Sequence, residues 1–177
     1  MCGIVGYTGT APVRDILLEG LRKLEYRGYD SAGIAVETND KISIVRRVGK
    51  VEELAKAVED WDVTSTCGIG HTRWATHGRP TEPNAHPHSD CSGKIAVVHN
   101  GIIENFVQLR DLLESEGHVF KSETDTEIVA HLIEKYYDGD LIDALAHTTE
   151  VLQGAYGLAV MHVDHPGEIA VTRKDSP

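Results

Sequence analysis

Short, nearly continuous apolar runs are the feature of this sequence that most limits its fold. They lie at residues 4–7, 33–36, 42–45, 68–70, 95–98, 158–163 and 169–171. Such runs are typical of strands that are covered on both faces. The turn residues Asn39-Asp40 separate two of the runs, and residues 164–167 separate another two. Short turns of this kind predict antiparallel pairing.

Apolar residues also recur at helical spacing, which predicts about five amphipathic helices. We expect them at residues 13–24, 51–61, 106–113, 128–133 and 141–152. Helices that each carry one apolar face must cover a sheet. The pattern therefore predicts an α+β fold in which stacked antiparallel sheets carry outer helix layers.

Composition limits the classes of function. The 177 residues are 41% hydrophobic, which suits one domain over residues 1–177, and the net charge is -11. This charge repels phosphate, so we expect no nucleic-acid or membrane partner. The three cysteines are too few for a disulfide framework, which favours a cytoplasmic location. No apolar stretch is long enough to span a membrane, and no leader precedes Cys2.

Cys2 is the candidate nucleophile. Removal of Met1, common before a small residue, leaves a thiol and a free α-amine on the same carbon. An α-amine with a pKa of about 7.7–8.0 is a suitable base for that thiol at neutral pH. The alternative is that Cys2 is a small apolar residue at the start of a buried strand.

Two stretches that follow strands carry candidate substrate-binding groups. His71–Gly78 contains Arg73, whose guanidinium suits a carboxylate; the alternative is a surface arginine beside a packed Trp74. In His99–Asn105, the pair Asn100-Gly101 is a strong turn signal. The same pair could instead supply an amide side chain and a backbone N–H to an oxyanion hole.

Two further stretches are less specific. In 122–127, Thr124 and Glu127 have the spacing of a helix capping box, and Asp125 suits either the helix dipole or a bound ammonium group. In 24–33, a helix end followed by a tight turn contains Arg27, which we expect to help orient the site.

Histidines and a cysteine gather at His71, His77, His86, His88 and Cys91. Their spacing matches no closed zinc pattern, because there is no Cys-x-x-Cys pair and no His-Glu-x-x-His helix. Gly68-x-Gly70 also lacks the third glycine of a dinucleotide-binding loop. We therefore predict neither a metal nor a nucleotide site.

Taken together, seven ordered motifs resemble the class II glutamine amidotransferases, which belong to the N-terminal-nucleophile hydrolases. The motifs are MCGIVG at 1–6, RGYDSAG at 27–33, HTRWATHG at 71–78, NAHPH at 84–88, HNGIIEN at 99–105, SETDTE at 122–127 and GAYG at 154–157. Within the class, LEYRGYDSAG and HTRWATHG are similar to the glutaminase domain of the glucosamine-6-phosphate synthases. The resemblance implies a four-layer αββα sandwich with two antiparallel sheets.

The resemblance also implies roles for particular residues. Cys2 would attack the side-chain amide of L-glutamine, and Asn100 and Gly101 would hold the oxyanion. Arg73 would bind the substrate α-carboxylate and Asp125 the α-ammonium group. Trp74 would belong to a loop that closes over glutamine, with Thr76 and His77 lining the pocket. No cofactor is expected.

The synthases carry a second half, a sugar isomerase, that residues 1–177 do not contain. The resemblance implies this isomerase domain, its sugar phosphate (fructose-6-phosphate) and a homodimer as partners of the full-length enzyme. Alternatives are another class II enzyme such as the phosphoribosyl amidotransferase, or a related hydrolase of a different amide. A histidine-rich metal-binding or regulatory module with an inert N-terminus is the alternative outside the enzymes.

Overall fold

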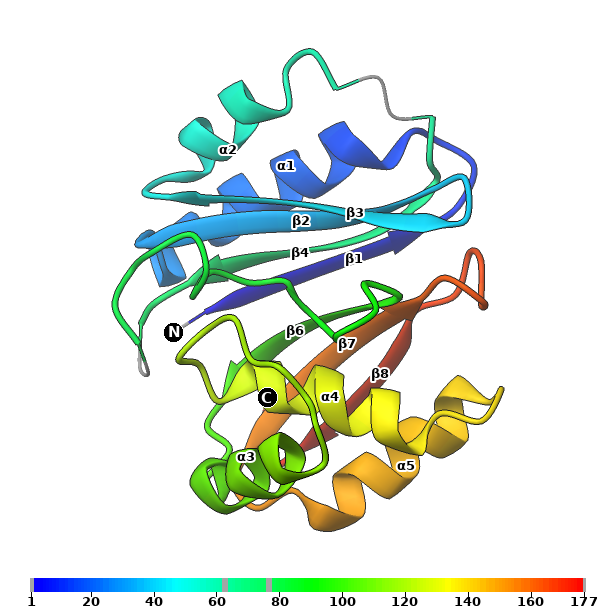
Figure 1. Cartoon of the computed structure of the whole chain (residues 1–177). Coiled ribbons are helices and arrows are strands. Elements are labelled where there is room, and N and C mark those ends of the chain that lie inside the picture. Colours follow the sequence, from blue (N-terminus) through cyan, green and yellow to red (C-terminus); the bar gives the residue numbers. More distant parts are fainter. Residues whose placement is uncertain (1, 62–63, 76–77, 177) are drawn as a thin grey trace.

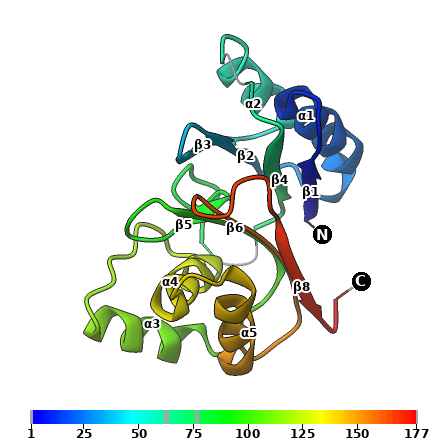
Figure 2. The same cartoon turned by 90° about the vertical axis from the view of Figure 1, so that its right-hand side faces the viewer.

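The structure is a computed structural model that describes residues 2–61, 64–75 and 78–176. Within these residues, two antiparallel sheets stack face to face between two layers of helices (Figure 1). Figure 2 shows the same layers from the side. The expected α+β class and the αββα layering are both confirmed.

The first sheet has the strand order β1-β4-β2-β3. Its strands are β1 (Gly3–Thr8), β2 (Ser31–Thr38), β3 (Lys41–Val48) and β4 (Cys67–Arg73). The predicted hairpin joins β2 to β3, where Asn39 and Asp40 have φ of 43° and 60°. Positive φ at both central residues defines the turn whose twist matches that of paired strands.

The second sheet has the strand order β5-β6-β7-β8. Its strands are β5 (His88–Ser89), β6 (Ile95–Gly101), β7 (Tyr156–His162) and β8 (Ala170–Lys174). The short strand β5 lies in the long connection between β4 and β6. It pairs with β6 through His88 and Ser89.

Helices cover the outer face of each sheet. The first sheet is covered by α1 (Val13–Leu24) and α2 (Val51–Ala57), and the 3-10 turn η1 (Glu25–Arg27) follows α1. The second sheet is covered by α3 (Phe106–Ser115), α4 (Thr126–Tyr136) and α5 (Leu141–Val151). Each helix layer buries its apolar stripe in one core cluster.

A third core lies between the sheets and is built largely from small side chains. It joins Ala35 and Ile69 of the first sheet to Ala96, Val98 and Met161 of the second. Burial on both faces explains why these strands are nearly continuous apolar runs.

Three local expectations are wrong. The apolar pattern predicted a helix through Trp61, but α2 ends at Ala57 and Trp61 packs on the core beyond it. Asn100-Gly101 is not a hairpin turn, because both residues pair with β7 at the end of β6. Glu127 does not close a capping box; its carboxylate accepts the N–H groups of Lys121 and Ser122.

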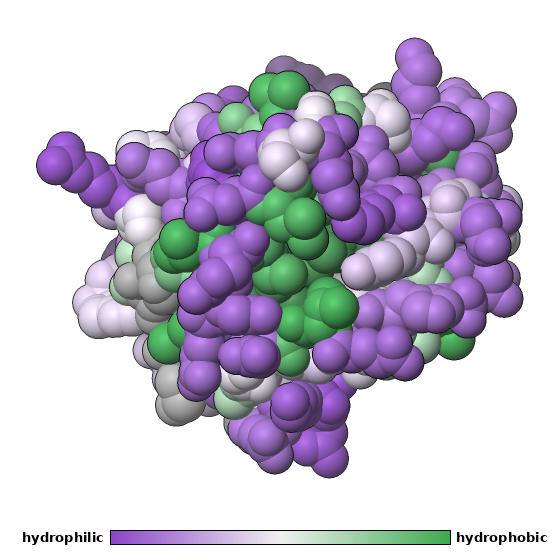
Figure 3. Space-filling view, turned by 60° about the horizontal axis from the view of Figure 1, so that its bottom comes forward, coloured by the Kyte–Doolittle hydropathy of each residue, from purple (hydrophilic) through white to green (hydrophobic). Residues whose placement is uncertain are grey.

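Figure 3 shows one face of the molecule, where hydrophobic residues gather in the centre and hydrophilic residues enclose them. A gathered apolar area of this kind is a surface available for contact. No helix of the described residues is long and apolar enough to cross a membrane.

Candidate active site

The ends of several elements meet at one edge of the sandwich. Because β1 and β4 are antiparallel, with Gly3 opposite Thr72, the start of β1 lies beside the end of β4. The end of β6 and the start of α4 reach the same edge. They enclose a pocket of about 600 Å³.

Every predicted site residue that the structure describes lines this pocket. They are Cys2, Arg27, Arg73, Trp74, Asn100, Gly101 and Asp125. The predicted residues Thr76 and His77 lie outside the described residues.

The thiol of Cys2 is held by the backbone of the segment that leaves β4. Its Sγ accepts a hydrogen bond from the N–H of Trp74 at 3.2 Å and lies 3.6 Å from the Trp74 carbonyl oxygen. Burial raises the pKa of the Cys2 thiol, although the bond from Trp74 opposes this shift. A thiol in this state needs a base before it can act as a nucleophile.

Asn100 is oriented by His71, which lies in the HTRWATHG motif but was not among the predicted site residues. Nε2 of the buried His71 lies 2.9 Å from the His99 carbonyl oxygen and 3.0 Å from Asn100 Oδ1. A carbonyl only accepts, so Nε2 carries the proton and donates to both oxygens. The amide nitrogen of Asn100 then points the other way, and donates to the Cys2 carbonyl oxygen at 3.3 Å.

Gly101 completes this corner with a backbone that another residue would not adopt. Its φ is 128°, and a Cβ at this position would lie 2.1 Å from the carbonyl oxygen of Ala155. Only glycine fits between β6 and the segment that precedes β7.

Charged groups of opposite sign lie in the same pocket. Arg73 is buried, and its guanidinium donates to the carbonyl oxygen of Gly78 at 3.2 Å. Asp125 precedes α4, and its Oδ2 accepts the N–H of Ile103 at 2.8 Å. The pocket therefore presents a cation and a carboxylate to any molecule that enters it.

The turn that follows η1 fixes the segment around Trp74. The carboxylate of Asp30 accepts the N–H of Ala75, and the backbone N–H of Asp30 donates to the Arg73 carbonyl oxygen at 3.1 Å. Trp74 is 49% exposed and packs edge-on against the ring of Tyr29. Asp30 belongs to the RGYDSAG motif but was given no role of its own, because an aspartate in a tight turn is ordinary.

The histidines beside the pocket form a buried scaffold. The ring of His86 packs against those of His71 and His88. Burial lowers the pKa of His71 and of His88 to about 3, so both are neutral at physiological pH. Cys91 lies elsewhere, and the group of possible metal ligands found among the described residues includes Cys91 but none of these histidines.

Known proteins resemble this chain along its whole length. A family model described as a glutamine amidotransferase domain matches residues 71–175. The glutamine–fructose-6-phosphate aminotransferase (isomerizing) of Thermus thermophilus is 55% identical over 177 residues, which are 100% of this chain and 29% of that protein. The protein of the same name from Pyrococcus horikoshii is 52% identical over 179 residues, 100% of this chain and 30% of that protein.

A solved structure shares the fold. It is the glutamine phosphoribosylpyrophosphate amidotransferase of B. subtilis, with a TM-score of 0.79 and 31% identity over 92% of this chain and 35% of that chain. The present chain spans less than a third of the length of the two aminotransferases from Thermus thermophilus and Pyrococcus horikoshii.

Proposed function

Because the chain belongs to the glutamine amidotransferase domain family, we propose that it hydrolyses L-glutamine to L-glutamate and ammonia. One observation carries the proposal: the Cys2 thiol shares a pocket with Asn100, Gly101, Arg73 and Asp125. These groups are a nucleophile, two candidate oxyanion donors and the two charges that complement a free amino acid.

Substrate binding depends on the two charges. Arg73 forms paired hydrogen bonds to the α-carboxylate of glutamine, and Asp125 accepts from its α-ammonium group. The side-chain amide then extends toward Cys2. Trp74 closes over the bound substrate, and Arg27 supports the pocket wall from η1.

The reaction proceeds in two steps through a covalent intermediate. The α-amine of trimmed Cys2 takes the thiol proton, and Sγ attacks the amide carbon of glutamine. Asn100 Nδ2 and the Gly101 N–H stabilise the oxyanion that forms. Its collapse breaks the C–N bond, and the leaving nitrogen takes the proton as ammonia. Water then attacks the thioester, releasing glutamate and restoring the thiol.

We propose further that this ammonia passes to fructose-6-phosphate in a longer protein. In that protein, residues 1–177 form the glutaminase domain, and an isomerase domain holds the sugar phosphate. Two relatives named for this reaction are 55% and 52% identical to the chain, against 31% for the phosphoribosylpyrophosphate amidotransferase that is the alternative. A homodimeric, cytoplasmic enzyme belongs to the same proposal.

The experiment separates trimmed from untrimmed protein by mass and measures glutamate release by each. The trimmed form should release glutamate, and the form that retains Met1 should not. In the untrimmed form the nitrogen of Cys2 is a peptide amide without a basic lone pair. Both forms should fold, since one terminal residue contributes few buried contacts. Equal turnover by both forms would show that another group is the base.

Two variants and a chelator complete the test. Cys2→Ala should abolish glutamate release, whereas the matched control Cys67→Ala should retain it, because Cys67 lies in the core between the sheets. Substantial activity in Cys2→Ala would overturn the proposed nucleophile. Activity that remains in Cys2→Ala but disappears with a chelator would instead favour a metal-dependent amidase.

A further inference from the structure

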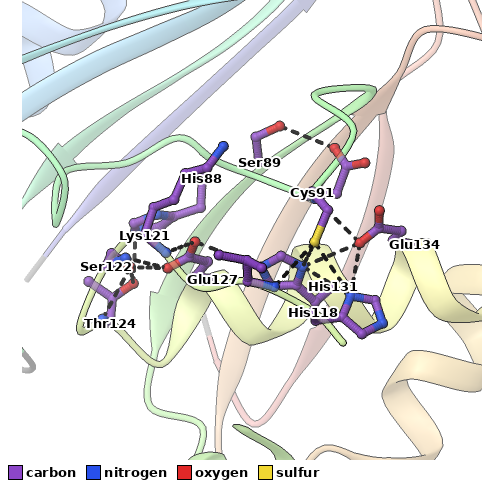
Figure 4. A network of polar contacts seen from close by, with 12 residues as sticks. His88, Ser89, Cys91, His118, Lys121, Ser122, Thr124, Glu127, His131 and Glu134 are labelled. Carbon is purple, nitrogen blue, oxygen red and sulfur yellow. Dashed lines mark hydrogen bonds and ion pairs between the residues drawn. The ribbon is translucent and has the colours of Figure 1, made fainter. Parts of the chain in front are cut away.

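A second group of reactive side chains lies outside the pocket. It consists of Cys91 from the β5–β6 connection, His118 from the α3–α4 connection, and His131 and Glu134 from α4 (Figure 4). One atom from each, namely Sγ, two Nδ1 atoms and Oε2, turns toward the same point. These potential ligand atoms all lie within 4.8 Å of one another.

The separations between these atoms are specific. The two Nδ1 atoms of His118 and His131 lie 3.3 Å apart. Cys91 Sγ lies 3.5 Å from His131 Nδ1 and 3.8 Å from His118 Nδ1. Glu134 Oε2 lies 3.0 Å from His118 Nδ1 and 3.3 Å from His131 Nδ1.

A tetrahedral zinc site has nearly the same edges. Zn–N bonds of about 2.05 Å place two nitrogens about 3.3 Å apart, and a Zn–S bond of about 2.3 Å places sulfur about 3.5 Å from nitrogen. A Zn–O bond of about 2.0 Å places oxygen about 3.3 Å from nitrogen. The five separations given above differ from these values by no more than a few tenths of an ångström, and the sixth, between Cys91 Sγ and Glu134 Oε2, is below 4.8 Å.

The N–H of Cys91 donates to Glu134 Oε2 at 3.3 Å, but hydrogen bonds do not account for all four converging atoms. If both facing Nδ1 atoms carry protons, the two protons oppose each other. If one Nδ1 atom lacks its proton, that nitrogen has nothing to donate to Glu134. A proton lies along one edge of the tetrahedron, whereas a cation at its centre contacts all four atoms at once.

The surroundings orient the ligands as expected for a metal site. Nε2 of His131, the nitrogen that does not face the group, lies 3.7 Å from Oε1 of Glu127. A carboxylate behind a histidine favours the tautomer that leaves the other nitrogen free to bind metal. The N–H of Val119 donates to Cys91 Sγ at 3.4 Å, which helps to stabilise a thiolate.

We propose that Cys91, His118, His131 and Glu134 bind one Zn²⁺ as a structural site. Four protein ligands close the tetrahedron and leave no position for a substrate. The ion would fasten the β5–β6 and α3–α4 connections to α4. Glu127, behind His131, also accepts the N–H of Ser122, so the site supports the segment that leads to Asp125.

The first test measures metal in the unmodified chain. After extensive chelation, the protein is titrated with Zn²⁺ against a chromogenic chelator, and separately with Co²⁺, whose absorption reports thiolate and imidazole ligands. We expect one ion per chain, a thiolate-to-cobalt absorption band, and a higher melting temperature with Zn²⁺ but not with Mg²⁺.

Variants locate the ion. Cys91→Ser and His118→Ala should lose the metal, and Glu127→Gln should weaken binding about 10- to 100-fold, as for other residues behind a ligand. Cys67→Ser and His147→Ala are the matched controls, and Cys2→Ala excludes binding by an N-terminal cysteine. All three should retain one ion with the affinity of the unmodified chain.

The outcomes decide the proposal without reference to activity. Absence of stoichiometric Zn²⁺ and of the cobalt band in the unmodified chain would overturn it, even if a ligand variant fails to fold. Unchanged binding in folded Cys91→Ser would also overturn it, and loss of the ion in Cys2→Ala would place the metal at the N-terminus.

Discussion

Some side chains of a pocket interact with the substrate throughout the reaction, and others interact only with the transition state. An oxyanion exists only during the reaction, so Asn100, as the proposed donor, would act on the transition state. The α-carboxylate of glutamine keeps its charge throughout, so Arg73, as its proposed partner, would stabilise substrate and transition state alike. The proposed roles therefore separate in steady-state kinetics.

Asn100→Ala should lower kcat by about 10²–10³, or roughly 2.7–4 kcal/mol, the usual effect of losing one oxyanion donor. His71, which donates to Asn100 Oδ1, would keep its second acceptor, the His99 carbonyl oxygen. Unfolding in urea checks that the variant is folded. A variant that loses only affinity for glutamine would contradict this role.

Arg73→Ala should raise KM with a smaller change in kcat, because uniform binding is lost. Arg73→Lys should be intermediate, since it keeps the charge but not the paired hydrogen bonds. Initial rates of glutamate release over a range of glutamine concentrations measure both constants. A fall in kcat with unchanged KM would mean that Arg73 and Asn100 have been assigned in reverse.

Asp125 should select free glutamine over glutamine within a peptide. A blocked N-acyl glutamine amide offers neither the ammonium group for Asp125 nor the carboxylate for Arg73. We expect little hydrolysis of the blocked compound by the unmodified chain. Comparable hydrolysis of both compounds would leave Asp125 only its observed contact with the N–H of Ile103.

At the scale of elements, the site depends on strand ends that meet without room for side chains. Gly101 at the end of β6 combines a φ of 128° with a close approach to the Ala155 carbonyl oxygen. Gly117, after α3, has a φ of 98°, and a Cβ added there would have no atom within 4 Å apart from those of its chain neighbours. The two glycines share a positive φ and differ in the space around them.

Gly117→Ala should therefore lower the free energy of unfolding only by the backbone strain, about 1–3 kcal/mol. Gly101→Ala should lower the free energy of unfolding by about 1–3 kcal/mol more than Gly117→Ala does, because the new methyl group displaces the backbone of Ala155. Urea unfolding of both variants measures the difference. Equal losses would show that the β6 end adjusts freely to a side chain.

At the scale of the whole molecule, a buried histidine joins the two sheets. His71 belongs to β4 of the first sheet, and both of its acceptors, on His99 and Asn100, belong to β6 of the second. Burial lowers the pKa of His71 to about 3. The unfolded chain, with a histidine pKa of about 6.5, binds a proton that the folded chain excludes.

Stability should therefore rise with pH between about 3 and about 6.5, and His71 should contribute about 1.4 kcal/mol per pH unit. His71→Gln keeps an N–H donor but removes this titration. Urea unfolding at about pH 5 and about pH 6 measures how steeply the free energy of unfolding rises with pH. For His71→Gln this slope should be shallower than for the unmodified chain by about one proton. Parallel slopes would mean that His71 is protonated in the folded state.

Local sequence determined most of the elements and pointed to a candidate nucleophile. Helical spacing of Val13, Leu17 and Leu21 located α1, because periodicity depends only on which face is buried. Cys2 is the candidate nucleophile because its thiol and α-amine lie on the same carbon. The spacing of Thr124 and Glu127 suggested a capping box. The carboxylate of Glu127 instead accepts the N–H groups of Lys121 and Ser122, which lie outside its helix.

Only the tertiary structure decided which distant groups meet. The spacing of His71 gave no hint of its bonds to His99 and Asn100 across the two sheets. The short spacing from His71 to Cys91 suggested one histidine cluster. The fold instead places Cys91 beside His118 and His131. Apolar periodicity encodes that a face is buried but not what covers it, so contacts between layers follow from the order in which the strands pack.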